Sequence, residues 1–275
     1  MAKTVQEKFE KNNEWWRERR AKALANVTDK TIAETEKQLM EYYQRTQKKV
    51  IGQFEKTYNK VLSTIAEGKQ PTPADLYKLD TYWQMEAQIR KELTLLGDKQ
   101  AELLGKSFNQ EWQNIYDALA QQDGLMFNQI DTEAAKQMIN SVWCADGKTW
   151  SERVWDNIGN LQATLNEELI TCVVAGRKTT ELKKALQERF GVSYNQANTL
   201  VRTEMAHIQT EAARDRYKKS GLTQVEVWAD YDERRCDVCA ELHKTKHDIN
   251  GTMPVPAHPN CRCCILPVLD VEFDD

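Results

Sequence analysis

Two short segments near the C-terminal end of the chain hold most of its cysteines. Cys236 and Cys239 form a C-x-x-C pair, and the run HPNCRC, which contains His258, Cys261 and Cys263, follows after 18 intervening residues. Zinc in proteins takes about four thiolate or imidazole ligands in tetrahedral geometry, and a tight turn with two thiolates closed by a distant His/Cys pair supplies them. We therefore expect four of these five residues to bind one structural zinc ion.

The spacing leaves the exact ligand set open. Cys263 can replace His258 or Cys261, whereas Cys263 and Cys264 are unsuited to binding one ion together because neighbouring side chains on an extended chain diverge. His243 is a reserve ligand between the two segments. The competing interpretation is a set of reduced, buried cysteines. The segment is short and rich in proline, so it has little apolar material with which to fold, and a metal would stabilise it where burial does not.

Composition limits the class of protein. The 275 residues carry a net charge of -4, with 40% hydrophobic and 29% charged residues, and the mean hydropathy is -0.71. The acidic balance argues against binding of nucleic acid by the whole chain, since that requires excess Lys and Arg. No membrane span or signal peptide is recognisable, so we expect a cytoplasmic protein without disulfides, in which clustered cysteines indicate metal binding.

Apolar residues recur at helical spacing through most of the chain, and an alternating pattern follows near its end. Capping residues, glycines and prolines divide the pattern into helices at about 1–27, 29–67, 73–96, 99–119, 132–142, 151–176, 179–191 and 193–219, and a strand at 223–230. The predicted fold is mainly α, with long helices followed by short strands in a small α+β C-terminal module. We predict a helical region at 1–140 and a second domain at 141–275, with a change of structural class near residue 221.

Trp15 and Trp16 stand among basic residues in the first predicted helix. One interpretation is that both rings pack in the core against the next helix. The other is an arm that docks a partner subunit, since Trp and Arg are enriched at binding hot spots.

An ordered set of motifs in the C-terminal half resembles the phage Mu protein F-like head-morphogenesis family. It consists of LVRTEMAH at Leu200–His207, Gly221, the strand around Trp228, the C-x-x-C pair, and PVPAHPNCRC at Pro254–Cys263. The resemblance covers about 140–269. It implies a minor capsid protein of a tailed bacteriophage, in the virion near the portal, made in the host cytoplasm. It also implies contact with the portal protein, with scaffold or major capsid protein, and a role in DNA packaging or ejection. Where the family usually has glycine after the C-x-x-C segment, this chain has His243.

Two other classes of function remain open. A metal-dependent nuclease would use the cluster with Glu204 or His207, but four Cys/His ligands close a zinc site to substrate, and no known catalytic motif is present. A zinc module that binds packaged DNA would use the basic residues around the cluster, which are Arg234, Arg235, Lys244, Lys246 and Arg262. We favour a structural protein that is not an enzyme.

Overall fold

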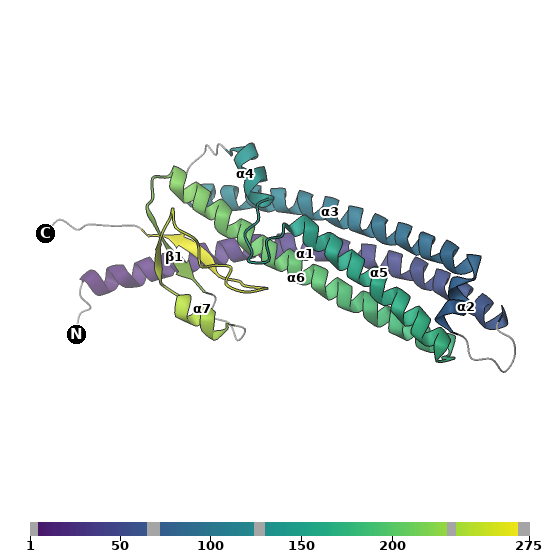
Figure 1. Cartoon of the computed structure of the whole chain (residues 1–275). Coiled ribbons are helices and arrows are strands. Elements are labelled where there is room, and N and C mark those ends of the chain that lie inside the picture. The colour runs from purple at the N-terminus through teal and green to yellow at the C-terminus, as the bar shows by residue number, and fades with distance from the viewer. Residues whose placement is uncertain (1–4, 65–71, 124–129, 230–234, 269–275) are drawn as a thin grey trace. The chain divides into compact units, whose positions relative to one another are not determined.

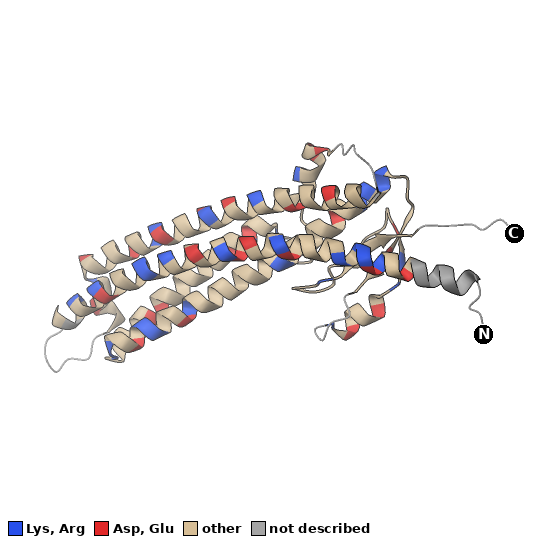
Figure 2. Cartoon of the chain, turned by 180° about the vertical axis from the view of Figure 1, so that it is seen from behind, with Lys and Arg blue, Asp and Glu red and all other residues tan. Residues whose placement is uncertain are grey.

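The computed structural model describes residues 5–64, 72–123, 130–229 and 235–268. Its helices and strands (Figure 1) are α1 Val5–Thr64, α2 Pro73–Tyr77, α3 Asp80–Asp123, α4 Thr132–Ile139, α5 Trp150–Val174, α6 Thr179–Lys219, β1 Gln224–Trp228, α7 Asp237–Leu242, β2 Lys246–Asp248 and β3 Cys264–Pro267. The prediction of long helices followed by a small α+β module is confirmed. Acidic and basic residues are interspersed along the long helices (Figure 2). None of the described helices has an apolar stretch that would cross a membrane.

Helix α1 is continuous where the sequence predicted a break at residues 27–29. The polar residues taken as a helix cap have other partners. Thr28 is buried and donates a hydrogen bond to Glu111 Oε1 at 2.5 Å, and Thr31 donates to the carbonyl of Val27 one turn earlier, at 3.2 Å. Thr28 therefore makes a tertiary contact and Thr31 a hydrogen bond within the helix, although threonine is also a residue type that suits a helix cap.

Two more predicted breaks are wrong for a common reason. Helix α3 runs through Gly97 and helix α6 runs through Gly191. A glycine inside a helix costs only about 1 kcal/mol relative to alanine, and the buried residues beside these glycines, Leu96 and Phe190, favour continuation through packing. The predicted helix at 73–96 is conversely divided, because Lys78 and Leu79 separate α2 from α3.

The chain forms two compact units. Unit 1 comprises residues 1–34, 105–141 and 199–275, and unit 2 comprises residues 35–104 and 142–198. The predicted division at 140/141 lies beside one passage between the units, at Ser141/Val142, but each unit also takes segments from the other predicted domain. Since α1, α3 and α6 each contribute to both units, hydrophobic periodicity along the sequence does not show where one unit ends.

Unit 2 is a helical bundle with a buried polar network at its centre. The network joins Tyr43 of α1, Asn157 of α5 and Ser193 of α6. Asn157 Nδ2 donates to Tyr43 Oη at 3.1 Å and to the Ser193 carbonyl at 2.9 Å, while Ser193 Oγ donates to Asn157 Oδ1 at 3.0 Å. Burial raises the pKa of Tyr43 to about 12, so this hydroxyl stays protonated.

The C-terminal part of unit 1 carries the predicted α+β module. Its three strands form an antiparallel sheet in the order β2-β1-β3, in which Glu226 is aligned with Lys246 of β2 and with Leu266 of β3. The strand predicted at 223–230 is confirmed as β1. Gly221, with φ of 80°, ends α6 in the left-handed conformation that glycine adopts without strain and so directs the chain into the sheet.

The structure decides between the two interpretations of the tryptophan pair. Trp15 is 52% exposed and Trp16 60% exposed. The interpretation of the pair as core residues is therefore wrong.

Candidate metal centre

Helix α7 positions the C-x-x-C pair. Cys236 is the N-cap residue of α7, and its Sγ accepts a hydrogen bond from the backbone N–H of Cys239 at 3.4 Å. The two thiols are therefore separated by one helical turn and face the same space. The backbone hydrogen bond from Cys239 lowers the pKa of Cys236, which favours the thiolate form that binds metals.

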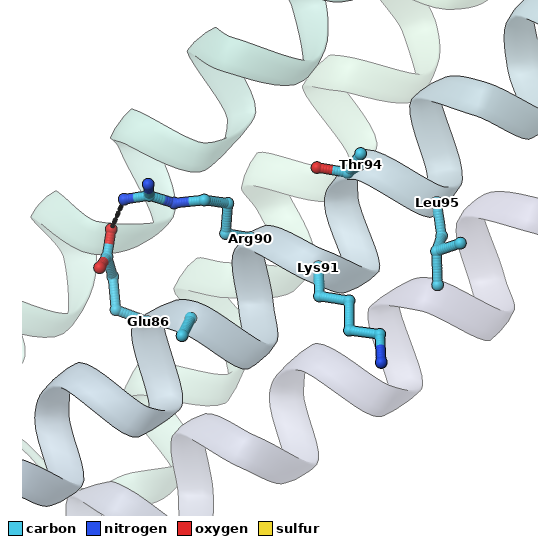
Figure 3. Close-up of a pocket in the computed structure, with 6 residues that line it drawn as sticks. Glu86, Arg90, Lys91, Thr94 and Leu95 are labelled. Atoms are coloured by element: carbon cyan, nitrogen blue, oxygen red, sulfur yellow. Dashed lines mark hydrogen bonds and ion pairs between the residues drawn. The ribbon is translucent and has the colours of Figure 1, made fainter.

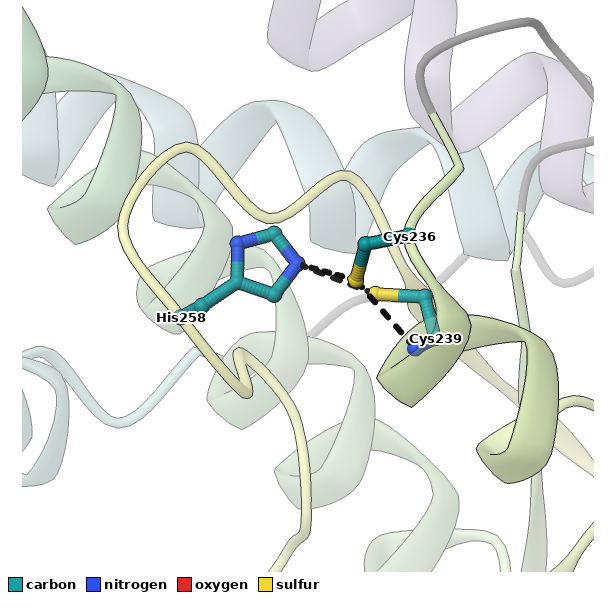
Figure 4. Close-up of side chains that lie close together, drawn as sticks. All are labelled: Cys236, Cys239 and His258. Carbon is teal, nitrogen blue, oxygen red and sulfur yellow. Dashed lines mark hydrogen bonds between the residues drawn. The ribbon is translucent and has the colours of Figure 1, made fainter.

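The loop before β3 brings His258 to these thiols. His258 Nε2 lies 3.3 Å from Cys236 Sγ and 3.1 Å from Cys239 Sγ (Figure 4). The other ring nitrogen, Nδ1, is 2.8 Å from the carbonyl of Pro259. Only a protonated Nδ1 can donate to that carbonyl, and this contact raises the pKa of His258. In the neutral ring with this tautomer, Nε2 carries the lone pair that a metal ligand needs.

Cys261 lies beside Cys239. Its Sγ lies 3.9 Å from Cys239 Sγ, and its backbone N–H donates to the His258 carbonyl at 3.1 Å. Tetrahedral zinc with its usual bond lengths holds neighbouring ligand atoms about 3.5–3.8 Å apart. The separations of His258 Nε2 from the Sγ atoms of Cys236 and Cys239, and of Cys239 Sγ from Cys261 Sγ, are close to those that such an ion requires.

Cys263 also lies beside Cys239. The ligand atoms of Cys239, Cys261 and Cys263 are all within 4.8 Å of one another, as are those of Cys236, Cys239 and His258. A hydrogen bond with Cys263 lowers the pKa of Cys261 to about 5 and raises that of Cys263 itself. Cys261 and Cys263 therefore both remain candidate ligands beside Cys239.

The structure brings all five predicted ligand residues together and places the other two candidates elsewhere. Cys264 lies in β3, aligned with Trp228 of β1. His243 Nδ1 accepts a hydrogen bond from the backbone N–H of Ala229 at 3.1 Å, and its ring lies 4.8 Å from that of Trp228. Cys264 therefore belongs to the sheet, and His243 packs against the end of β1.

Helix α6 supports the loops that carry the cluster, which the sequence did not indicate. Thr203 Oγ1 accepts a hydrogen bond from the backbone N–H of Asn260 at 3.1 Å, between His258 and Cys261. Arg214 donates from Nε to the Ile249 carbonyl at 2.7 Å and from Nη2 to the Gly251 carbonyl at 2.8 Å. The only sequence signal for these contacts is the presence of polar residues within an otherwise apolar helical pattern.

The residues proposed for catalysis are buried. Glu204 is 2% exposed and His207 is 8% exposed, and burial lowers the pKa of His207 to about 4, so its ring is neutral at pH 7. A side chain that assists hydrolysis has to reach the substrate. Neither side chain is placed on the surface where a nucleic acid would bind.

A shallow groove also lies along α3. All its lining residues come from one helix, and its arginine is already paired: Arg90 Nη2 lies 2.6 Å from Glu86 Oε1 (Figure 3). It contains no group of residues suited to catalysis or to metal binding, so the cysteine cluster is the better candidate site.

Fold and site together define a mainly helical protein whose C-terminal α+β module carries a Cys/His cluster able to hold a metal ion. Residues 163–266 match the family model described as phage Mu protein F like protein. Residues 163–266 are therefore similar to this family, which confirms the resemblance found in the motifs. Searches of the curated proteins and of the solved structures gave no match.

Proposed function

We propose that the chain is a minor capsid protein of a tailed bacteriophage that associates with the portal and assists procapsid assembly and DNA packaging or ejection. The observation that carries the proposal is the family match over residues 163–266, which includes the second half of α5, all of α6, nearly all of the sheet and the cysteine cluster. Its partners are the portal protein and scaffold or major capsid protein. It resides in the phage head interior or near the portal, and in the host cytoplasm during assembly.

The metal centre has a structural role in this proposal. Four of the residues Cys236, Cys239, His258, Cys261 and Cys263 would hold one zinc ion. Zinc would supply bonds that tie α7 to the loop before β3. A site closed by four protein ligands leaves no position for substrate. Together with the burial of Glu204 and His207, this supports a protein that is not an enzyme.

Cofractionation with phage particles tests the proposal. Heads are purified from cells infected with a phage whose own copy of this chain carries an epitope tag, and the chain is quantified relative to the portal protein. We expect the chain in procapsids and in mature heads, in a fixed low ratio to portal. Particles that contain portal but lack the chain at both stages would contradict the proposal.

Binding of packaged DNA by the C-terminal module is a second candidate, supported by two exposed cations near the cluster. Arg262 lies between Cys261 and Cys263, and its Nη2 is 3.5 Å from Asp29 Oδ2. Lys246 lies on the edge strand β2, and both cations are exposed. Lys244 pairs with Glu14 at 2.5 Å, and Arg234 lies outside the described residues. If Arg262 contacts a phosphate, Arg262→Ala should reduce the slope of log K against log salt by about 1. The control Lys184→Ala, at an exposed site in unit 2, should leave the slope unchanged.

A further inference from the structure

The first turns of α1 after residue 12 present two large aromatic side chains to solvent. The rings of Trp15 and Trp16 form an edge-to-face pair with centroids 4.9 Å apart. The guanidinium of Arg19 lies 5.3 Å from the Trp15 centroid and 5.8 Å from the Trp16 centroid. Lys22, one turn further along, is also exposed. We call these four residues the Trp/Arg face.

The rest of this helical segment is held to the C-terminal module. Arg17 Nη2 lies 3.2 Å from Glu226 Oε2 in β1, where the Glu226 side chain is only 4% exposed. Lys244 Nζ lies 2.5 Å from Glu14 Oε1. These ion pairs join the same helical segment to the C-terminal module, while the Trp/Arg face is exposed. An exposed aromatic pair beneath an arginine is the kind of side-chain group that dominates binding surfaces.

We propose that the acidic segment 269–275 of the same chain docks on the Trp/Arg face. This segment has the sequence LDVEFDD and lies outside the described residues. It contains four carboxylate side chains, no lysine or arginine, and the aromatic residue Phe273. The carboxylates complement Arg19 and Lys22 in charge, and Phe273 suits a surface made of indole rings.

The register of the sheet puts the start of this segment close to α1. Glu226, which binds Arg17, is aligned with Leu266 of β3, and Val268 donates its backbone N–H to the Gln224 carbonyl at 3.2 Å. The seven residues after Val268 therefore start three positions beyond the partner of Glu226. They can extend up to about 23 Å, whereas Trp16 and Arg19 are one and two positions from Arg17 on the helix.

Fluorine NMR of the full chain labelled with fluorotryptophan tests the proposal. Signals of Trp15, Trp16 and Trp155 are assigned from single Trp→Phe variants. The four carboxylate side chains of segment 269–275 are removed by the combined changes D270N, E272Q, D274N and D275N, which we call tail neutralisation. We expect neutralisation to shift the Trp15 and Trp16 signals and to leave the Trp155 signal in place, because Trp155 is 39% exposed but belongs to unit 2. High salt should cause the same shifts, since it screens exposed charges.

Arg19→Glu provides the matched control. The substitution shifts the Trp15 and Trp16 signals by itself, because the Arg19 guanidinium lies over both rings. The result that supports docking is that tail neutralisation then has no further effect on these signals. Unchanged Trp15 and Trp16 signals after tail neutralisation would overturn the proposal and leave the face to another molecule. Shifts that develop only as protein concentration rises would contradict docking within one chain. None of these outcomes depends on the role in phage assembly.

Discussion

The helical bundle of unit 2 and the C-terminal module at residues 222–268 are stabilised in different ways. The bundle buries large side chains along long helices, among them Phe54, Leu93, Leu165 and Phe190, so its stability is spread over much apolar area. The module has strands of five, three and four residues, and four of its buried residues are cysteines. A region with so little regular structure depends on a few contacts, and losing one of them has a large effect.

Removal of one ligand should have the largest effect. Cys239→Ser should unfold the module and leave the bundle folded, because structural zinc in small domains contributes about 10–16 kcal/mol of apparent binding free energy that is coupled to folding. Hydrogen exchange followed by mass spectrometry should show loss of protection at 235–268 and unchanged protection in unit 2. Cys264→Ser, a buried thiol of the same module outside the cluster, is the control and should retain most of the protection. Equal losses in both variants would contradict a metal-dependent module.

Disruption of the polar network should affect the other region. Asn157→Ala removes three buried hydrogen bonds of the network, although the Tyr43 hydroxyl keeps Gln100 and Ser193 as partners. Such a loss typically costs about 1–3 kcal/mol. Denaturant unfolding should show this loss in the free energy of unfolding of unit 2, with metal content unchanged. A variant that lost metal as readily as helical structure would show that the two regions are not separately stabilised.

A pair of glycines in the bundle tests helix packing with opposite expected signs. A Cβ at Gly97 would lie 2.5 Å from the Trp155 ring, whereas a Cβ at Gly191 would meet nothing within 4 Å. Gly97→Ala should therefore destabilise unit 2 by about 1–3 kcal/mol through overpacking. Gly191→Ala should stabilise it by about 0.5–1 kcal/mol through helix propensity. Thermal unfolding of the two variants beside the wild type measures both changes, and equal shifts of the same sign would contradict the close contact at Gly97.

The smallest effect on metal affinity is expected where α6 supports the loop that carries His258 and Cys261. Thr203→Ala removes the acceptor of the Asn260 N–H, a contribution of about 1 kcal/mol. Chelator competition should show a roughly fivefold weaker affinity for zinc, since RT ln 5 is about 1 kcal/mol. Thr164→Ala, which removes a hydroxyl bound only within α5, is the control. No difference between the two variants would show that Thr203 does not position the loop.

The sequence predicted the features that depend on neighbouring residues and missed those that depend on distant ones. The C-x-x-C and HPNCRC spacing predicted the cluster because a helix cap and a tight turn position those ligands locally. Helix α5 was predicted because its apolar stripe ends at Gly176. The breaks at 27–29, 97 and 191 were wrong because Thr28 bonds to Glu111 and because packing beside Gly97 and Gly191 outweighs the cost of glycine. The Arg214 contacts join positions more than 30 residues apart, for which no local pattern exists.

Metal content tests the central claim most directly. Elemental mass spectrometry on the purified full chain, with Cys239→Ser beside it, should find about one zinc per wild-type chain and a large loss in the variant. Wild-type protein that carries no metal, even after it is purified under reducing conditions with zinc supplied, would contradict the account. The cysteines would then be free thiols, and the stability of the module would need another source.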